Sequence, residues 1–316
     1  MDIIREADYA RAIKEDIAPS IEAVRTDGFC ESFDGTPLFY HIYRAENAKS
    51  SLVLLHGFTE SSEKYEEMIL YFLKSGADVY VYDQRGHGKS GGKVGDKTIT
   101  HVDRFSEYVS DLECFMDKIV SKDLPLYLFA HSMGGAVAAL YMEKHPEVFK
   151  KAVLSSPMIA PSTGGYPAFV GRAICRMMIL FGGAKKRIFL SSEYPGEEKF
   201  ADSCDTSEPR FAHYEYFKRT HADYQNYSPS YRWTLESLKV TKKLLKKGEP
   251  EKIKTGVLLL SAGLDTVVSL PAQAAFAGRL SSCRMITYPK AKHEIYYSAD
   301  DVMERFLRDI FDFLDE

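Results

Sequence analysis

Ser132, Asp265 and His293 have the residue types of a nucleophilic catalytic triad, although they lie far apart in the chain. A serine hydroxyl is a poor nucleophile until a base removes its proton, and a histidine held by a carboxylate is a common base for this purpose. The three side chains can act together only if the fold brings their loops to one place. The sequence around each residue indicates that it does.

Ser132 follows an apolar run at 126–130 and precedes a helix-forming stretch, in the order Ala-His-Ser-Met-Gly. This pattern predicts a sharp turn from strand to helix, where the residues two before and two after the serine must be small to avoid neighbouring backbone. Ala130 and Gly134 meet this requirement, although the usual pattern is G-x-S-x-G. The alternative is that Ser132 only caps the helix, and the short motif alone does not separate the two interpretations.

The other two members of the expected triad follow later strands. Asp265 comes just after the apolar run 256–260, and His293 comes just after the run 284–288. The order serine, acid, histidine fits three loops at the carboxyl edge of one parallel sheet. Asp83 is a rival for the acid because it also follows a strand. We interpret Asp83 instead as a structural residue whose carboxylate holds the backbone of the turn D-Q-R-G-H-G-K-S.

Acyl transfer also requires backbone N–H groups that stabilise a developing oxyanion. The first expected donor is Met133, at the start of the helix after the serine. The second is Phe58, in L-L-H-G-F-T-E after the strand at 51–55. The alternative for His56–Gly57 is a simple turn between a strand and a loop.

The rest of the chain predicts elements that would position these loops. Two β-prone runs around Asp34-Gly35 indicate an antiparallel hairpin, and alternating strands and helices follow it. We therefore expect a mostly parallel, eight-stranded sheet with helices on both faces. The alternating segments are 51–55, 63–75, 79–82, 103–120, 126–130, 133–144 and 152–155, and then 256–260, 271–280, 284–288 and 300–314.

The alternation of strands and helices stops between residues 157 and 231, where glycine pairs and aromatic residues replace apolar strands. We expect residues 158–231 to form a helical cap, or lid, inserted into the sheet domain. The domain itself would then comprise residues 1–157, with an N-terminal helical extension, and residues 232–316.

Composition narrows the function classes. The chain has 316 residues, a net charge of −4 and 45% hydrophobic residues, with a pI near 6.2, so nucleic acid is an unfavourable partner. Its five cysteines are widely spaced and form no C-x-x-C pair, which argues against a disulfide framework or a zinc site. No secretion signal or membrane-spanning stretch is apparent, and we expect a cytoplasmic protein without metal or cofactor. The oligomeric state is left open.

Five motifs lie in order along the chain, namely L-L-H-G-F, D-Q-R-G-H-G-K-S, A-H-S-M-G-G, S-A-G-L-D-T-V-V and K-H-E. Through these motifs the chain resembles the monoacylglycerol lipase and bacterial lysophospholipase group of α/β-hydrolases, which are similar to the S33 serine aminopeptidases. The resemblance covers nearly the whole chain and is looser between residues 158 and 231. It implies the α/β-hydrolase fold and a serine esterase or lipase. It also implies the catalytic roles given above for Ser132, Asp265 and His293, and the oxyanion role of the Phe58 and Met133 amides.

The expected substrate is a small, lipid-like ester such as a lysophospholipid or a monoacylglycerol. The alternatives are short-chain or aromatic, cinnamoyl-type esters, and a catalytically inactive binding protein. The aromatic cap could line an acyl channel or touch a membrane surface transiently, although most of its side chains are expected simply to pack. Candidate substrate contacts are His131, Phe169, Met177, Tyr227 and Trp233.

Overall fold

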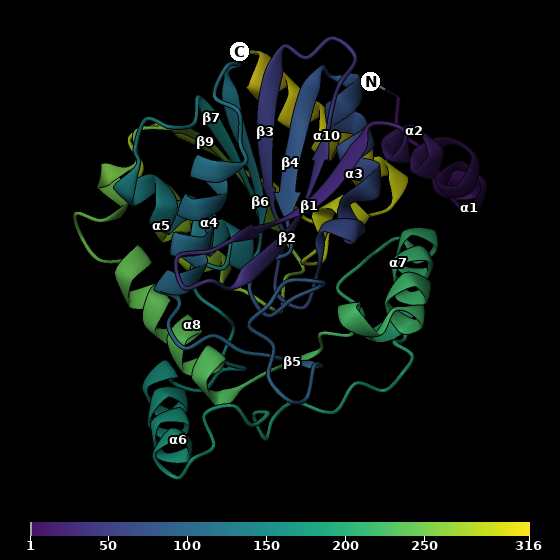
Figure 1. Ribbon diagram of the computed structural model, residues 1–316. Coiled ribbons are helices and arrows are strands. Elements are labelled where there is room, and N and C mark those ends of the chain that lie inside the picture. Colours follow the sequence, from purple (N-terminus) through teal and green to yellow (C-terminus); the bar gives the residue numbers. More distant parts are fainter. Residues whose placement is uncertain (1) are drawn as a thin grey trace.

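A computed structural model describes residues 2–316 and contains the predicted eight-stranded sheet (Figure 1). The strand order is β1-β2-β4-β3-β6-β7-β9-β10. The pairs β1–β2 and β2–β4 are antiparallel and all other neighbours are parallel. The strands are β1 (Arg25–Glu31), β2 (Pro37–Tyr43), β3 (Ser50–Leu55), β4 (Ala77–Tyr82), β6 (Leu126–His131), β7 (Lys151–Ser155), β9 (Gly256–Ala262) and β10 (Cys283–Tyr288).

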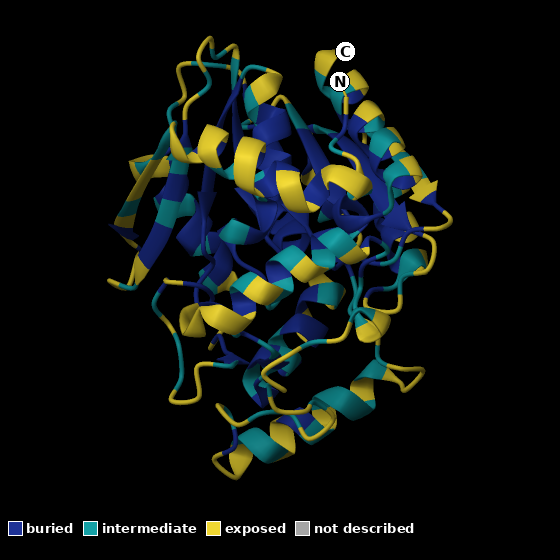
Figure 2. Ribbon diagram, turned by 90° about the vertical axis from the view of Figure 1, so that its right-hand side faces the viewer, coloured by how far each residue is buried: buried dark blue, intermediate teal, exposed yellow. Residues whose placement is uncertain are grey.

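Helices cover both faces of the sheet, as the sequence predicts for strands without polar alternation. One face packs against α4 (Ser106–Lys118), α5 (Met133–Lys144), α8 (Tyr231–Leu244) and α9 (Leu270–Ala277). The other face packs against α3 (Glu66–Lys74) and α10 (Asp300–Asp315), together with the N-terminal helices α1 (Tyr9–Ala12) and α2 (Ala18–Glu22). The sheet is therefore enclosed, and exposed residues gather on the outer faces of the helices (Figure 2).

The C-terminal helix α10 shows how the sequence pattern produces this packing. Its buried residues recur every three or four positions, which places them on one face of the helix. They belong to the same apolar cluster as strands β3 and β4. The buried residues are Val302, Met303, Phe306, Leu307, Ile310 and Phe313.

Between β7 and β9 the chain leaves the sheet, as expected for residues 158–231. This segment contains α6 (Ala168–Leu180) and α7 (Glu208–Thr220), and its strand β8 (Ser228–Pro229) pairs with β5 (Ile99–Thr100). Helix α6 lies at the end of the molecule away from the two chain termini, whereas α7 lies at its side, near α1 (Figure 1). The division into a sheet domain and a cap at these boundaries stays a prediction.

The two helices of this segment are held differently. On α7, the fully buried Arg210 binds the Glu67 carboxylate of α3 at 2.8 Å and the carbonyl of Ile4 at 2.7 Å. By contrast, α6 contributes Cys175 to a small cluster with Tyr231 and Leu235 of α8. Thus α7 is fixed to the core and to the N-terminal extension, whereas α6 rests on α8.

The helix after the predicted nucleophile carries a buried carboxylate without hydrogen bonds. Both carboxylate oxygens of Glu143 on α5 are buried without a hydrogen-bond partner. Burial raises the pKa of Glu143 to about 7, and the nearby charge of Glu249 acts in the same direction against Lys243 and Lys252. Because the pKa of Glu143 is raised in the folded state, ionising this side chain costs folding free energy. The cost is absent below the pKa that Glu143 has in the unfolded chain, and it grows as the pH rises toward 7.

We therefore expect Glu143→Gln to stabilise the protein at pH 8 by on the order of 1 kcal/mol, and by less at pH 5. Urea unfolding at the two pH values measures the difference. The exposed residue Glu46 provides the control, since Glu46→Gln should change stability little at either pH. An equal effect of Glu143→Gln at both pH values would contradict the assignment of a raised pKa.

Candidate active site

Ser132 lies at the sharp turn between β6 and α5 that the sequence predicts. Its backbone has φ 49° and ψ −116°, a strained conformation for a residue with a side chain. The strand before it and the helix after it pack closely on β3. A Cβ atom at Gly134 would lie 2.5 Å from the carbonyl oxygen of Leu55 and 2.6 Å from that of His56. Only glycine fits at this position, which is the steric requirement inferred from the motif.

The structure brings Ser132, His293 and Asp265 within hydrogen-bonding reach of one another. His293 Nε2 is 2.8 Å from Ser132 Oγ, and His293 Nδ1 is 2.7 Å from Asp265 Oδ2. With its proton on Nδ1, the imidazole donates to Asp265 and presents Nε2 as the acceptor for the serine hydroxyl. Ser132 and His293 are each only 5% exposed, so the pair is largely shielded from bulk water.

Asp265 is held as a carboxylate by the loop that carries it. Its second oxygen, Oδ1, accepts the N–H groups of Val267 at 2.8 Å and Val268 at 3.0 Å. Burial opposes its ionisation, but the hydrogen bond and charge of His293, together with the two amides, leave the pKa of Asp265 below its usual value. The carboxylate therefore remains charged and orients the histidine.

Asp83 is the structural residue that the sequence analysis proposed. Its Oδ1 accepts the backbone N–H and the hydroxyl of Ser62, at 2.9 and 2.7 Å, and its Oδ2 accepts the N–H of Lys89 at 2.9 Å. Both oxygens are thus occupied in holding loops. The interpretation of Asp83 as a turn residue is confirmed by these contacts, and the assignment of Asp265 as the catalytic acid stays a prediction.

The two expected oxyanion donors come from different elements of the fold. Met133 is the first residue of α5, directly after Ser132. Phe58 lies in the loop after β3, where two buried histidines fix the backbone around it. His56 Nε2 accepts the N–H of Gln84 at 2.8 Å, and His87 Nε2 accepts the N–H of Thr59 at 3.3 Å. The oxyanion role of the Phe58 and Met133 amides stays a prediction.

Two of the five candidate substrate contacts lie against this site. The His131 ring packs 4.8 Å from the His293 ring, between centroids, and Trp233 packs 4.1 Å from the ring of Phe58. Burial lowers the pKa of His131 to about 4, so His131 is neutral at neutral pH. Both residues therefore pack against groups predicted for the site, and their contact with substrate stays a prediction.

The other three candidates have no such contact with the triad or the oxyanion loop. Tyr227 packs against Tyr194 and the Lys218 ammonium. Phe169 and Met177 lie on α6 and are 65% and 51% exposed. Their predicted part in binding substrate has no contact in the structure to support it.

The sequence analysis missed a buried polar group beside His131. The Glu60 carboxylate, 4% exposed, contacts Gly57, Tyr65 and Tyr296, with Lys64 close by. The available signal was a charged residue in L-L-H-G-F-T-E, in the same loop as Phe58. The sequence alone did not indicate that this carboxylate faces inward.

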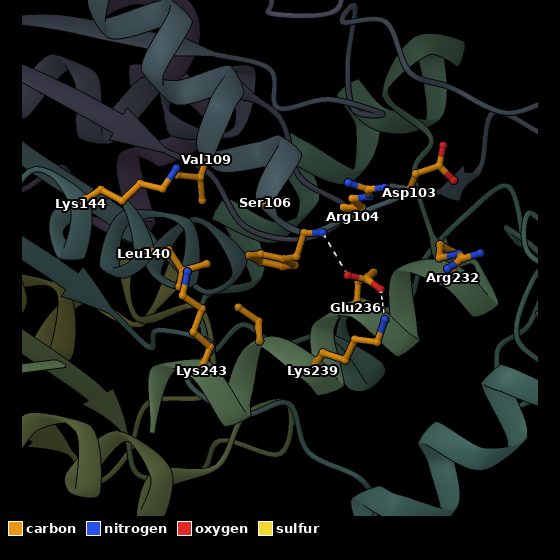
Figure 3. Close-up of a pocket in the computed structure, with 12 residues that line it drawn as sticks. Asp103, Arg104, Ser106, Val109, Leu140, Lys144, Arg232, Glu236, Lys239 and Lys243 are labelled. Carbon is orange, nitrogen blue, oxygen red and sulfur yellow. Dashed lines mark hydrogen bonds and ion pairs between the residues drawn. The ribbon is translucent and has the colours of Figure 1, made fainter. Parts of the chain in front are cut away.

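A groove of about 400 Å³ lies elsewhere, between α4, α5 and α8 (Figure 3). Phe105, Val109, Leu140 and Val240 form its apolar part, and Arg104 and Lys243 are among its charged residues. None of the residues predicted for the site lines this groove. It is therefore separate from the triad.

The sequence and the fold that carry this site are shared with known proteins. The family model described as serine aminopeptidase, S33, matches residues 46–300, which is most of the chain. The chain belongs to this family. Its members are serine hydrolases of the α/β-hydrolase fold, and the matched residues include Ser132, Asp265 and His293.

Relatives of this serine hydrolase carry the names that the motifs suggest. Lysophospholipase L2 of Escherichia coli is 28% identical over 290 residues, covering 89% of this chain and 84% of that protein. A probable lysophospholipase L2 of Haemophilus influenzae is 24% identical over 315 residues, covering 99% of both chains. A monoacylglycerol lipase of Mycolicibacterium smegmatis is 29% identical over 157 residues, covering 48% of this chain and 54% of that protein.

Solved structures confirm the fold of the hydrolase. A soluble variant of monoglyceride lipase from Saccharomyces cerevisiae superposes with a TM-score of 0.74, at 22% identity, covering 92% of this chain and 95% of that chain. Monoacylglycerol lipase from Paleococcus ferrophilus gives a TM-score of 0.68 at 24% identity, covering 88% and 98%. At these identities the likeness establishes the α/β-hydrolase fold.

The described part of the hydrolase lacks both a membrane-spanning helix and a metal-binding cluster. Across residues 2–316, every helix is too short or too polar to cross a membrane. The same residues hold no group of three or more His, Cys, Asp or Glu side chains that could bind a metal ion. The five cysteines have free thiols.

We expect Asp265→Asn to lower kcat by about 10,000-fold while the protein stays folded, because an amide no longer fixes the tautomer of His293. Ester hydrolysis and circular dichroism measure the two properties. Asp309→Asn is the matched control, since Asp309 also accepts a hydrogen bond, from Tyr288 OH at 2.6 Å, but lies on α10. A folded Asp265→Asn variant with near-normal turnover would rule out the proposed acid.

Proposed function

We propose that the chain is a carboxylic ester hydrolase that cleaves a monoacyl lipid, such as a lysophospholipid or a monoacylglycerol, through an acyl-enzyme on Ser132. The observation that carries the proposal is the continuous pair of hydrogen bonds from Ser132 through His293 to Asp265, at 2.8 and 2.7 Å. The names of the bacterial relatives support the lipid substrate.

In acylation, Ser132 Oγ attacks the ester carbonyl while His293 Nε2 takes the hydroxyl proton. The tetrahedral oxyanion accepts hydrogen bonds from the Met133 and Phe58 amides, and the N-terminus of α5 adds favourable charge. When the ester C–O bond breaks, His293 returns the proton to the leaving alcohol. In deacylation, a water molecule gives a proton to His293 and attacks the acyl-enzyme, and the histidine then reprotonates Ser132.

We expect wild-type protein to be labelled by a fluorophosphonate, because the activated Ser132 oxygen forms a stable bond to phosphorus. Ser132→Ala should not be labelled. Ser156, which is also buried and has a positive φ, provides the control: Ser156→Ala should label normally. Failure of wild type to label would favour an inactive binding protein.

The acyl preference follows from a chain-length series. We expect kcat/KM to rise from acetate to long-chain p-nitrophenyl esters and monoacylglycerols, since a monoacyl lipid presents more apolar surface to bury. Preference for acetyl or cinnamoyl esters would replace the lipid proposal with the esterase alternative.

We further propose that α6 and the chain after it contact a lipid surface. The segment exposes large apolar side chains, which cost free energy in water and gain it at a membrane interface. Two arginines of α6 and two lysines that follow the helix could meet anionic headgroups. The exposed apolar residues are Phe169 (65%), Met177 (51%), Leu180 (81%), Phe181 (79%), Phe189 (63%) and Leu190 (75%), and the cations are Arg172, Arg176, Lys185 and Lys186.

We expect the double variant Leu180→Asp with Phe181→Asp to lose cosedimentation with phosphatidylglycerol vesicles and to keep its activity on a soluble short-chain ester. The control is Phe29→Asp, since Phe29 is 60% exposed on the edge strand β1. Equal vesicle binding by the double variant and the wild type would show that this segment is not the contact.

A further inference from the structure

A buried carboxylate joins the two loops that must be aligned for catalysis. Glu60 lies two residues after Phe58 in the same loop, and its Oε2 accepts the N–H of Gly57 at 2.5 Å. Its Oε1 accepts the hydroxyl of Tyr296, in the loop that carries His293, at 2.6 Å. One side chain thus binds the residue before Phe58 and a residue three positions after His293.

We propose that Glu60 is a positioning residue that fixes the Phe58 amide relative to His293 by accepting hydrogen bonds from both loops at once. This inference rests on the proposed function. The loops that carry Phe58 and His293 are then aligned by a direct connection between them, and not only by the sheet beneath.

The packing around Gly57 shows how closely the carboxylate and this loop fit. A Cβ atom at Gly57 would lie 2.8 Å from Glu60 Oε2 and 2.9 Å from His131 Cδ2. The glycine before Phe58 is therefore required by the Glu60 carboxylate and the His131 ring, which lie against it. The adjacent residue Thr59 has φ 61°, so the loop is strained and needs external contacts to keep its conformation.

The Tyr296 side of the connection continues to His293 through rings in edge-on and tilted contact. The Tyr296 ring packs 5.1 Å from the ring of His131, and the His131 ring packs 4.8 Å from that of His293. Tyr296 is fully buried, so a shift of its hydroxyl displaces neighbours in a dense core. Movement at Glu60 is thereby transmitted to the imidazole.

The charge of Glu60 is retained although the side chain is enclosed. Burial opposes ionisation, but Lys64 and, when protonated, His131, together with the Tyr296 and Tyr65 hydroxyls, hold the pKa of Glu60 below its ordinary value. Lys64 Nζ is 3.4 Å from Glu60 Oε1 and also contacts Glu294. An ionised carboxylate accepts stronger hydrogen bonds than a neutral group, so the charge of Glu60 strengthens its hold on the two loops.

Tyr65 offers a matched control because it donates to the same carboxylate from outside both loops. Its hydroxyl binds Glu60 Oε2 at 2.7 Å, but Tyr65 lies at the end of the short 3₁₀ helix Ser62–Tyr65. Its ring stacks on that of Tyr296 at 4.8 Å, so the two tyrosines share one environment. Removing either hydroxyl takes one donor from Glu60, and only Tyr296→Phe cuts the connection between the loops.

The experiment compares Glu60→Gln, Tyr296→Phe and Tyr65→Phe with a soluble p-nitrophenyl butyrate substrate. We expect Glu60→Gln to lower kcat at least tenfold with KM within about twofold, because an oxyanion donor out of position weakens transition-state binding more than substrate binding. Tyr296→Phe should lower kcat more than Tyr65→Phe does. Urea unfolding measures the stability of each variant.

A trifluoromethyl ketone, which forms a tetrahedral adduct with the serine, gives a second readout. The inhibition constant of the ketone should rise across the variants in proportion to their loss of kcat/KM. A purely structural role would change the free energy of unfolding but leave both the inhibition constant and kcat/KM unchanged. A folded Glu60→Gln variant with kcat within twofold of wild type would overturn the inference. If Glu60→Gln does not fold, equal kcat values for Tyr296→Phe and Tyr65→Phe would overturn it.

The outcome is distinguishable from failure of the proposed function. Should Ser132→Ala keep its activity, the nucleophile is wrong, whatever Glu60 does. Should Ser132→Ala be inactive while the Glu60 and Tyr296 variants turn over normally, only the positioning role is lost.

Discussion

The candidate site depends on the hydrogen bond between His293 Nε2 and Ser132 Oγ, because a serine hydroxyl is a poor nucleophile until a base removes its proton. The bond joins residues 161 positions apart in the chain. It forms because β6, β9 and β10 run parallel in one sheet, so the loops after them open at a single edge. The strained turn at Ser132 then raises the hydroxyl from that edge toward the imidazole. The packing of the sheet around the turn offsets the free-energy cost of this strained backbone.

Buried polar side chains hold the loops around the candidate site. Asp83, His56 and His87 are each occupied by backbone N–H groups of the loops around the triad. Burial lowers the pKa of His87 to about 3, which keeps its ring nitrogen available as an acceptor at neutral pH. These groups convert flexible loops into a rigid frame, since an unmade hydrogen bond in this interior is costly.

Much of the sheet and of the triad could be predicted from the sequence, because both leave local signals. The run 133–144 after Ser132 is helical at the same bounds as α5, and Asp265 and His293 follow β9 and β10 as expected. The positions of Glu60 and of the aromatic candidates could not be predicted in this way. Glu60 acquires its role from Tyr296, 236 positions later, and no periodicity encodes such a contact.

The fixed position of α7 divides the region beyond the sheet into two mechanically unequal halves. The guanidinium of Arg210 connects α7 to α3, to the carbonyl of Ile4 and to the carbonyl of Ser298 at 3.2 Å. Separating such a buried ion pair is strongly unfavourable. Among the described residues, α6 has no such ion pair and is held by apolar packing on α8, so α6 is the more easily displaced of the two helices.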